Sequence, residues 1–453
     1  MKVATTAAPV RDSHTPGHNY WWEDPAKLLL WFIIPLYALV CIELLGDQKS
    51  IDRIYFNSQY AIAGALFLFV MAAAAGGERV LAPRPPEPAV TVSPLVLDAL
   101  FWLACLGYLV MMGGVIARPA VLMSFLNGTA STYDVLELKG RVAGISTLTQ
   151  ASVAYVPLYF VIFPAAVRGI TRYKAYLLVL FVLTLLRSFI FAERLALVEV
   201  VLPWALMVAR FRLQGGGELR RLLLTLGPFA AIPPLIGFFI ANEYNRSWET
   251  YYVNIYDNIF DFAIERLGLY YSTAINNGAG LLTIMGWGTG DPTFTFDWLV
   301  KFPVIGESFR PFVGRGDGYG TFLNTFGDPE FNNPSGLFVH FYEWGWFALL
   351  EAGLMGWLLG RSFAGWRTGN GFWCCAHAVL LVSLMEILRV PNLFSGRNFV
   401  PLALLWLVFR CLGRRVAPPH APNLSLYGRQ NDAHPVDSRL NYGRRNPPLA
   451  GPR

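Results

Sequence analysis

The sequence NNPSGLFVHFYEWGW (residues 332–346) marks the point where a long polar stretch of the chain re-enters an apolar run. The polar stretch, residues 241–335, lies between two strongly apolar runs at 222–240 and 336–359. It is rich in Asn, Tyr, Trp, Asp and Arg, residue types that commonly bind sugars and phosphates. This order of segments predicts a membrane protein with one large outer loop and with its chemistry at one face of the bilayer.

The composition excludes an ordinary soluble protein. Of 453 residues, 55% are hydrophobic and only 15% are charged, and the mean hydropathy is +0.43. Several apolar runs are long enough to cross a hydrocarbon core of roughly 30 Å. Because these runs are continuous rather than alternating, they predict helices and not barrel strands. The five cysteines fall inside apolar runs, where they are expected to be packing residues.

The predicted fold class is an all-α polytopic membrane protein. About ten transmembrane helices are expected, at residues 28–45, 60–75, 96–116, 148–167, 175–191, 195–208, 222–240, 336–359, 371–388 and 399–412. A cytoplasmic N-terminal tail (1–27) precedes this membrane domain (28–412), which includes the outer loop 241–335. The basic tail 413–453 is rich in Pro, Asn, Gly and Arg without apolar periodicity, which predicts disorder.

The distribution of Lys and Arg predicts the orientation. The clusters RGITRYK (168–174) and ARFRLQGGGELRR (209–221) lie on the same side of the predicted bundle. Cytoplasmic loops carry an excess of Lys and Arg, so this side is expected to be cytoplasmic, with both termini. The net charge of +6 is therefore interpreted as a signal of membrane orientation and not of nucleic-acid binding.

Within the outer loop, residues 249–271 show apolar positions at spacings of three and four. This spacing predicts an amphipathic helix that lies on the outer surface. Arg266 and Tyr270 are four residues apart and share one face of it. Arg266 is a candidate ligand-binding residue, or alternatively a solvated arginine paired with a loop carboxylate.

Motif searches give mostly negative results. The sequence contains no phosphate-binding GxxxxGK[ST] loop, no dinucleotide fingerprint, no HExxH and no GxSxG elbow. His, Cys and carboxylate residues do not recur at metal-ligand spacings. No metal or other cofactor is therefore expected.

Ionisable residues at the outer ends of the predicted spans are the remaining candidates, because such residues are costly near lipid. LRSFIFAERL (186–195) carries Arg187, Glu193 and Arg194 at a short turn. The alternative interpretation of Arg187 is snorkelling to the interface with a local salt bridge. SLMEILRVPNLFSGRN (383–398) carries Arg389 and Arg397, and the alternative for Arg389 is an ordinary pair with Glu386 on the same helix face.

His340 and Glu343 lie at the start of the next apolar run, with Glu351 about two turns deeper. The alternatives are a packed histidine and a carboxylate that caps a helix. Glu199 and Glu351 lie at predicted membrane depth, so each needs a partner or a proton. Together these groups predict a cationic outer cleft with carboxylates at its edge. Guanidinium groups bind phosphate bidentately, and a carboxylate or histidine can accept a proton from a sugar hydroxyl.

By this architecture and by short motifs, the chain resembles the bacterial O-antigen and exopolysaccharide polymerase family, also called oligosaccharide repeat-unit polymerases. The motifs are an arginine-bearing turn before a span, AERLALVEVVL (192–202), and the sequence Glu343-Trp344-Gly345 before a Gly-spaced helix, EAGLMGWLLG (351–360). The family usually has Asp at the position of Glu343, and a Leu-type residue at that of Trp346.

The resemblance implies a metal-independent membrane glycosyltransferase. It would transfer a growing glycan from undecaprenyl diphosphate to the next lipid-linked repeat unit, at the outer face of the cytoplasmic (inner) membrane. A flippase and a chain-length regulator are the implied protein partners. Glu343 is the favoured catalytic base and His340 its competitor. The expected substrate-binding residues are Arg187, Arg194, Arg266, Tyr270, Arg389 and Arg397.

Three other functions remain open, and one of them is a structural or scaffold role in a polysaccharide export complex. An O-antigen ligase-like enzyme would use a similar cleft with a different acceptor. A lipid-linked oligosaccharide flippase or transporter is less favoured, because such folds commonly have repeated halves and this sequence has no visible internal repeat.

The predicted orientation can be tested with introduced cysteines. A cysteine at Gly316, in the outer loop, is expected to react with an impermeant thiol reagent in intact spheroplasts, and one at Ser438, in the tail, is not. The opposite labelling pattern would exclude both the orientation and chemistry at the outer face.

Overall fold

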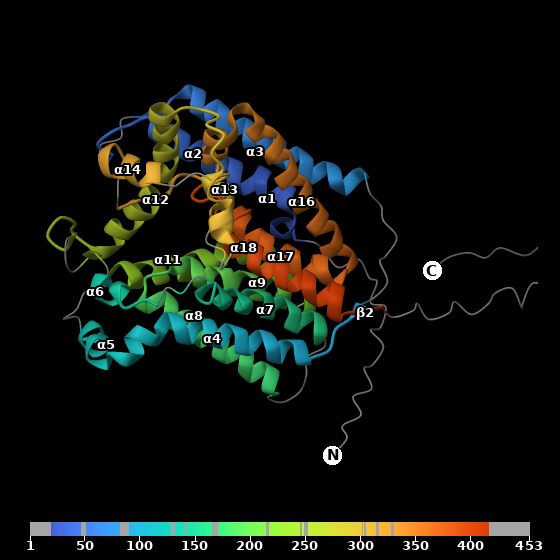
Figure 1. Cartoon of the computed structure of the whole chain (residues 1–453). Coiled ribbons are helices and arrows are strands. Elements are labelled where there is room, and N and C mark those ends of the chain that lie inside the picture. Colours follow the sequence, from blue (N-terminus) through green and yellow to red (C-terminus); the bar gives the residue numbers. More distant parts are fainter. Residues whose placement is uncertain are drawn as a thin grey trace, which may run out of the picture.

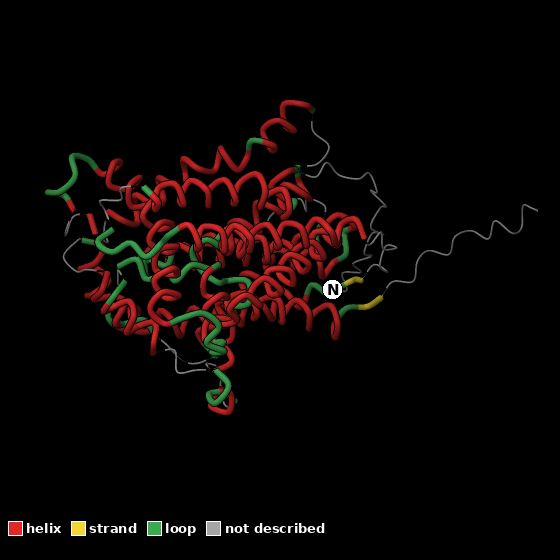
Figure 2. Tube along the Cα trace, turned by 90° about the horizontal axis from the view of Figure 1, so that it is seen from above, coloured by secondary structure: helices red, strands yellow, loops and turns green. Residues whose placement is uncertain are grey.

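The computed structural model describes residues 20–46, 51–81, 90–127, 132–140, 142, 144–164, 171–213, 217–244, 247–248, 252–300, 302, 305–313, 317–327 and 330–415. The predicted disordered tail lies almost wholly outside these residues, as do most of the N-terminal tail and the labelling positions Gly316 and Ser438. The described chain is mostly helical (Figures 1 and 2). One short antiparallel pair joins β1 (Val90–Thr91) to β2 (Arg414–Arg415).

The helices follow one another in this order along the chain: η1 Trp21–Glu23, α1 Pro25–Leu28, η2 Leu29–Ile33, α2 Ile34–Leu45, α3 Ser58–Leu81, α4 Leu95–Ala117, α5 Pro119–Leu126, α6 Thr132–Glu137, η3 Ser146–Gln150, α7 Ala151–Ile162, α8 Arg172–Ile190, α9 Arg194–Arg212, α10 Glu218–Thr225, α11 Gly227–Glu243, α12 Ile259–Met285, α13 Thr293–Val300, η5 Gly306–Phe309, α14 Asp317–Thr325, α15 Phe338–Trp344, η6 Gly345–Phe347, α16 Ala348–Thr368, α17 Gly371–Met385, α18 Gly396–Leu407 and η7 Val408–Leu412.

Among the described residues, four helices are long and apolar enough to cross a membrane: Pro25–Leu45, Ser58–Glu78, Leu95–Ala117 and Arg172–Ile190. A fifth span results if α10 and α11, which meet at a bend of 51°, are taken together. The outward faces of these helices carry large apolar side chains, such as Leu39 and Trp102, which are each 64% exposed. The all-α class and the membrane character are thus supported. The count of ten spans and the placement of 241–335 outside the bilayer stay predictions.

The core of the bundle is built on α3, α7, α16 and α17. α7 is buried over Ala151–Phe160 and α17 over Cys374–Leu384. α3 and α16 pack closely because glycines of α16 face α3. A Cβ atom at Gly356 would overlap the carbonyl oxygen of Met71, whereas one at Gly353 would lie 3.9 Å from Val70 Cγ1. Small residues that let two backbones approach are the usual basis of close packing between membrane helices.

The apolar run 336–359, predicted as one helix, consists of α15, η6 and α16. Gly345 ends α15 with a φ of 58°, a conformation that suits glycine. The last carbonyl groups of α15 accept hydrogen bonds from the 288–290 segment instead of from a continuing helix. The amides of Gly288, Thr289 and Gly290 donate at 3.1, 2.8 and 2.9 Å. The run is broken because this extended segment provides the partners that a continuous helix would have supplied.

The stretch 241–335 folds into several helices, of which α12 is the longest. Asn258 caps α12 by accepting hydrogen bonds from the amides of Phe260 and Asp261, both at 2.9 Å. The helix therefore begins later than the predicted 249–271 and continues to Met285. Its second half is buried over Ser272–Leu282 and packs against α15 and α2. The predicted surface helix is thus only the start of a longer helix that enters the bundle.

The α3–α16 contact predicts different effects for two neighbouring glycines. Gly356→Ala is expected to push the helices apart and to destabilise the protein by about 1–3 kcal/mol, the usual cost of overpacking. Gly353→Ala is the matched control, since its methyl group fits without overlap. Thermal unfolding in detergent measures both, and equal melting temperatures for the two variants would contradict the close contact at Gly356.

Candidate functional site

A buried carboxylate, Glu243, lies where three helices meet at their ends. Its side chain is fully buried at the end of α11. Oε1 pairs with Arg194 Nη2 of α9 at 2.6 Å, and Oε2 pairs with Arg266 Nε of α12 at 2.6 Å. The hydroxyl of Ser247 donates to Oε2 at 2.7 Å. A buried carboxylate is costly unless it is paired and hydrogen-bonded, so these contacts hold α9, α11 and α12 together.

Tyr270 joins a third arginine to this group. Arg194 Nη2 donates to the Tyr270 hydroxyl at 2.6 Å. The guanidinium carbons of Arg194 and Arg389 lie 4.9 and 5.0 Å from the centre of the Tyr270 ring, within the range of a cation–π contact. Arg389 also pairs with Glu386 at 2.8 Å, which confirms the local ion pair weighed from the sequence. Through Arg389, the turn after α17 therefore contacts Tyr270 of α12, which Arg194 of α9 also contacts.

Glu330 is the carboxylate of this group that is most open to solvent. It pairs with Arg266, and its Oε2 accepts a hydrogen bond from the Tyr252 hydroxyl at 3.0 Å. Its side chain is 37% exposed, while that of Glu243 is buried. We call this set the Glu243 network; its members are Arg194, Glu243, Arg266, Tyr270, Glu330, Glu386 and Arg389. It contains three arginines and three carboxylates, so its net charge is zero. The sequence had instead indicated a cationic cleft.

A second group of charges lies around Glu193, at the turn between α8 and α9. Arg187 Nε donates to Glu193 Oε2 at 2.7 Å and Arg187 Nη1 to Thr149 Oγ1 at 3.1 Å, and Lys139 also pairs with Glu193. Burial raises the pKa of Glu193, but the charges of Arg187 and Lys139 outweigh it and lower this pKa to about 2. The local salt bridge considered for Arg187 is present.

Arg397 belongs to the same second group. Its Nη1 pairs with Glu199 Oε1 at 3.1 Å, and Gln150 Nε2 donates to Glu199 Oε2 at 3.3 Å. Glu199, predicted to lie at membrane depth, therefore has an arginine as its partner. Lys139, Arg187, Glu193 and Arg397 line a polar cavity of about 210 Å³. The six predicted substrate-binding residues thus form two groups, which α9 connects through Arg194 and Glu199.

The predicted catalytic residues lie apart from both groups. Glu343 is buried and accepts hydrogen bonds from the amides of Phe294 and Thr295, so it caps the start of α13. The Thr295 hydroxyl donates to it as well. His340 stacks on Phe67 with ring centres 5.5 Å apart, and its Nδ1 lies 2.9 Å from Glu351. The contacts of Glu343 are those of the alternative in which it caps a helix, and the contacts of His340 are those of a packed histidine.

Sequence reasoning did not single out Glu243 or Glu330. Glu243 stands three residues beyond the predicted span 222–240, a position that is usually a solvated helix end. Glu330 lies in a Gly- and Pro-rich stretch without periodicity. The one available signal was that an unpaired Arg194 and Arg266 near lipid would each need a carboxylate.

Comparison with protein-family models, with curated proteins and with solved structures finds no match for this chain. Among the described residues, no group of three or more His, Cys, Asp or Glu side chains has an arrangement that could hold a metal ion. Fold and site together define a helical protein of the membrane type, with buried arginine–carboxylate pairs at the ends of its helices.

The Glu243 network predicts a large loss of stability on removal of its central charge. Glu243→Gln leaves Arg194 and Arg266 against a neutral amide, and breaking a buried pair in this way typically costs about 3–5 kcal/mol. Glu307→Gln is the control, because the side chain of Glu307 is 75% exposed and pairs with Arg310, which is also exposed. Thermal unfolding in detergent compares the two; a Glu243→Gln variant as stable as the control would contradict the role of this carboxylate.

Proposed function

We propose that the protein is a metal-independent membrane glycosyltransferase that polymerises undecaprenyl diphosphate-linked oligosaccharide repeat units at the outer face of the cytoplasmic membrane. The observation that carries the proposal is the meeting of Arg194, Arg266 and Arg389 at Tyr270 and Glu243. These arginines come from three segments that are distant in sequence. Such a convergence suits a ligand with several negative oxygens, since guanidinium groups remain charged and bind phosphate in fixed geometry.

Two donors of the network support a phosphate ligand. Arg194 Nη1 and Arg389 Nε are buried and have no hydrogen-bond partner in the described part of the chain. A buried donor without a partner typically costs about 1–3 kcal/mol. Both arginines lie against the ring of Tyr270, so a single phosphate group placed there after a small side-chain movement would satisfy both donors.

Glu330 is the residue that a diphosphate would displace. It is the most exposed of the three carboxylates, and it forms an ion pair with Arg266 while its own side chain stays partly exposed. In the proposed reaction the diphosphate replaces Glu330 on Arg266. Glu330 thereby loses its ion pair and stands beside the leaving group, where an acceptor hydroxyl can approach.

The chemical step is a glycosyl transfer. An oxygen of the acceptor sugar forms a bond to the anomeric carbon of the growing glycan, and the bond from that carbon to the diphosphate oxygen breaks. The acceptor proton passes to Glu330, and Arg194, Arg266 and Arg389 stabilise the negative charge of the departing diphosphate. We assign the base to Glu330 because it belongs to the network; the assignment of Glu343 or His340 from the family resemblance stays an untested prediction.

Turnover by purified protein with a lipid-linked repeat unit tests the proposal. Glu330→Gln is expected to lower glycan extension by about 10²–10⁴-fold, so that single repeat units accumulate. Arg194→Lys and Arg389→Lys are expected to impair turnover nearly as much as the alanine variants, because an ammonium group does not reproduce the geometry of guanidinium. Controls are the exposed pair members, Glu307→Gln and Arg310→Lys.

Three results would contradict parts of this proposal. Full activity of both lysine variants would remove the arginines from substrate binding. If the Glu330→Gln variant is active and the Glu343→Gln variant is folded but inactive, the catalytic base is Glu343, as the family resemblance favours. Transfer of glycan to a lipid acceptor other than the diphosphate carrier would identify a ligase-like enzyme.

A further inference from the structure

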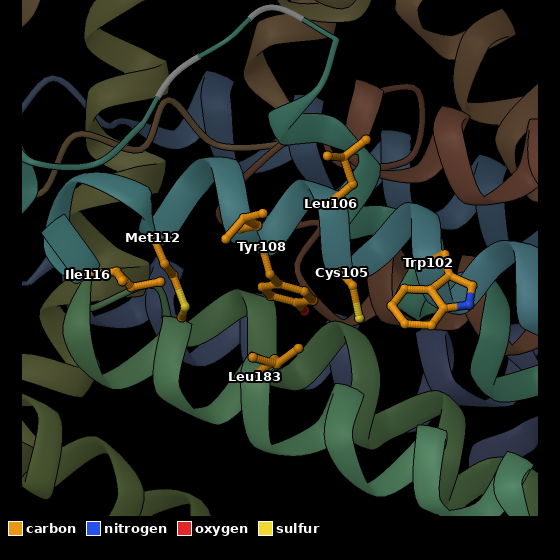
Figure 3. A pocket seen from close by; sticks show the side chains of 8 residues that line it. Trp102, Cys105, Leu106, Tyr108, Met112, Ile116 and Leu183 are labelled. Carbon is orange, nitrogen blue, oxygen red and sulfur yellow. The ribbon is translucent and has the colours of Figure 1, made fainter.

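An apolar groove runs between α4 and α8 (Figure 3). Its volume is about 440 Å³, and its lining includes Trp102, Leu106, Leu109, Met112 and Leu183. α4 and α8 are both candidate membrane spans by length and composition, so we expect the groove to lie at hydrocarbon depth. It opens outward, since Trp102 and Leu109 are 64% and 61% exposed. A groove of this kind is suited to a hydrocarbon chain.

The polar cavity around Glu193 adjoins the outer part of this groove. Met112 lines the groove and the preceding residue, Met111, lines the cavity. On α8, Leu183 lines the groove, and Arg187, four residues on, lines the cavity. Four residues are about one helical turn, or about 5.4 Å along the axis. The apolar site and the charged site are therefore one turn apart on α8, and they adjoin at consecutive residues of α4.

Among the described residues, the charges that line the cavity, taken with Glu199, add up to a single positive charge. Lys139, Arg187 and Arg397 contribute three positive charges, and Glu193 with Glu199, the partner of Arg397, contributes two negative ones. The rest of the lining is uncharged and includes Ser146, Thr147, Thr149 and Gln150. The carboxylate and hydroxyl oxygens are hydrogen-bond acceptors. The cavity thus suits a headgroup with one negative charge and with hydroxyl groups of its own.

We propose that an anionic membrane phospholipid with a phosphodiester and a glycerol headgroup binds here, with one acyl chain in the α4–α8 groove and its phosphate in the cavity. The single negative charge of the phosphodiester matches the single positive charge of the cavity. A free anion would leave the groove unused, and a diphosphate would bring more negative charge than the cavity balances. The headgroup hydroxyls would donate to the carboxylate and hydroxyl oxygens of the lining.

This lipid site is distinct from the Glu243 network, but it is mechanically linked to it. Glu193 directly precedes Arg194, the first residue of α9. A phosphate that contacts Lys139 and Arg397 would hold the α8–α9 turn in place, and with it the Arg194 that pairs with Glu243. The bound lipid would therefore stabilise the protein and does not take part in glycosyl transfer.

Binding of phosphatidylglycerol to the purified full-length protein in detergent tests the proposal, with native mass spectrometry and thermal unfolding as readouts. Phosphatidylglycerol is expected to bind and to raise the melting temperature, and phosphatidylcholine is not. Two variants are each expected to weaken binding about tenfold. Leu109→Trp fills the groove with a larger side chain. Lys139→Gln removes the excess positive charge and leaves the ion pair between Arg187 and Glu193 in place. The matched controls are Leu39→Trp, at a lipid-facing residue of α2 that is 64% exposed, and Arg310→Gln.

Several outcomes would overturn the proposal. Equal binding of phosphatidylcholine, or unchanged binding by the Leu109→Trp variant, would exclude a headgroup-selective lipid in this groove. Competition by glycerol phosphate as strong as that by the lipid would identify a site for a free anion. Displacement by a polyprenyl diphosphate that binds at least tenfold more tightly would assign the groove to the glycan carrier. None of these measurements needs turnover, so they are decided independently of the proposed glycosyl transfer.

Discussion

The buried carboxylate of Glu243, held between Arg194 and Arg266, is the interaction on which the junction of α9, α11 and α12 depends. α11 has few other anchors, because Phe239, Asn242 and Glu243 are its buried residues and most of its apolar side chains face outward. The charge pairs thus compensate for weak packing. They join a peripheral helix to α9 and α12, and they bring Arg194 against the ring of Tyr270, which Arg389 also contacts.

α12 gives this network a rigid support. Its first half carries Arg266 and Tyr270, and its second half is buried in the bundle. There the side chain of Asn276 accepts hydrogen bonds from the amides of Tyr55 and Phe56 at 2.8 and 3.2 Å and donates to the carbonyl of Arg53 at 2.8 Å. Because its second half is fixed in this way, α12 holds Arg266 and Tyr270 of its first half in position against α9. The network is therefore attached to the packed core and not only to a surface loop.

The two charged groups along α9 differ in net charge and in surroundings, so they suit different ligands. The Glu243 network is balanced and contains a displaceable carboxylate, Glu330, which suits exchange of one anion for another. The group around Glu193 has one excess positive charge and adjoins an apolar groove, which suits a resident amphiphile. Because α9 carries Arg194 and Glu199 and follows Glu193 directly, a ligand bound at either proposed site would affect the position of the other.

The sequence by itself determined the class of this protein, the approximate helices and the ionisable residues at their ends. Continuous apolar runs permit only helices in lipid, and an arginine near lipid must find a partner. It also identified the Glu386–Arg389 pair, because residues three apart on a helix are neighbours. What periodicity cannot report is which helices lie side by side, since it describes one helix and its faces.

Only the tertiary structure, therefore, joined Glu243 to arginines of two other helices, divided the predicted binding residues into two groups, and broke the run 336–359 at Gly345. It also placed Glu343 at the start of α13, where the partners of its carboxylate are amides of a segment far along the chain.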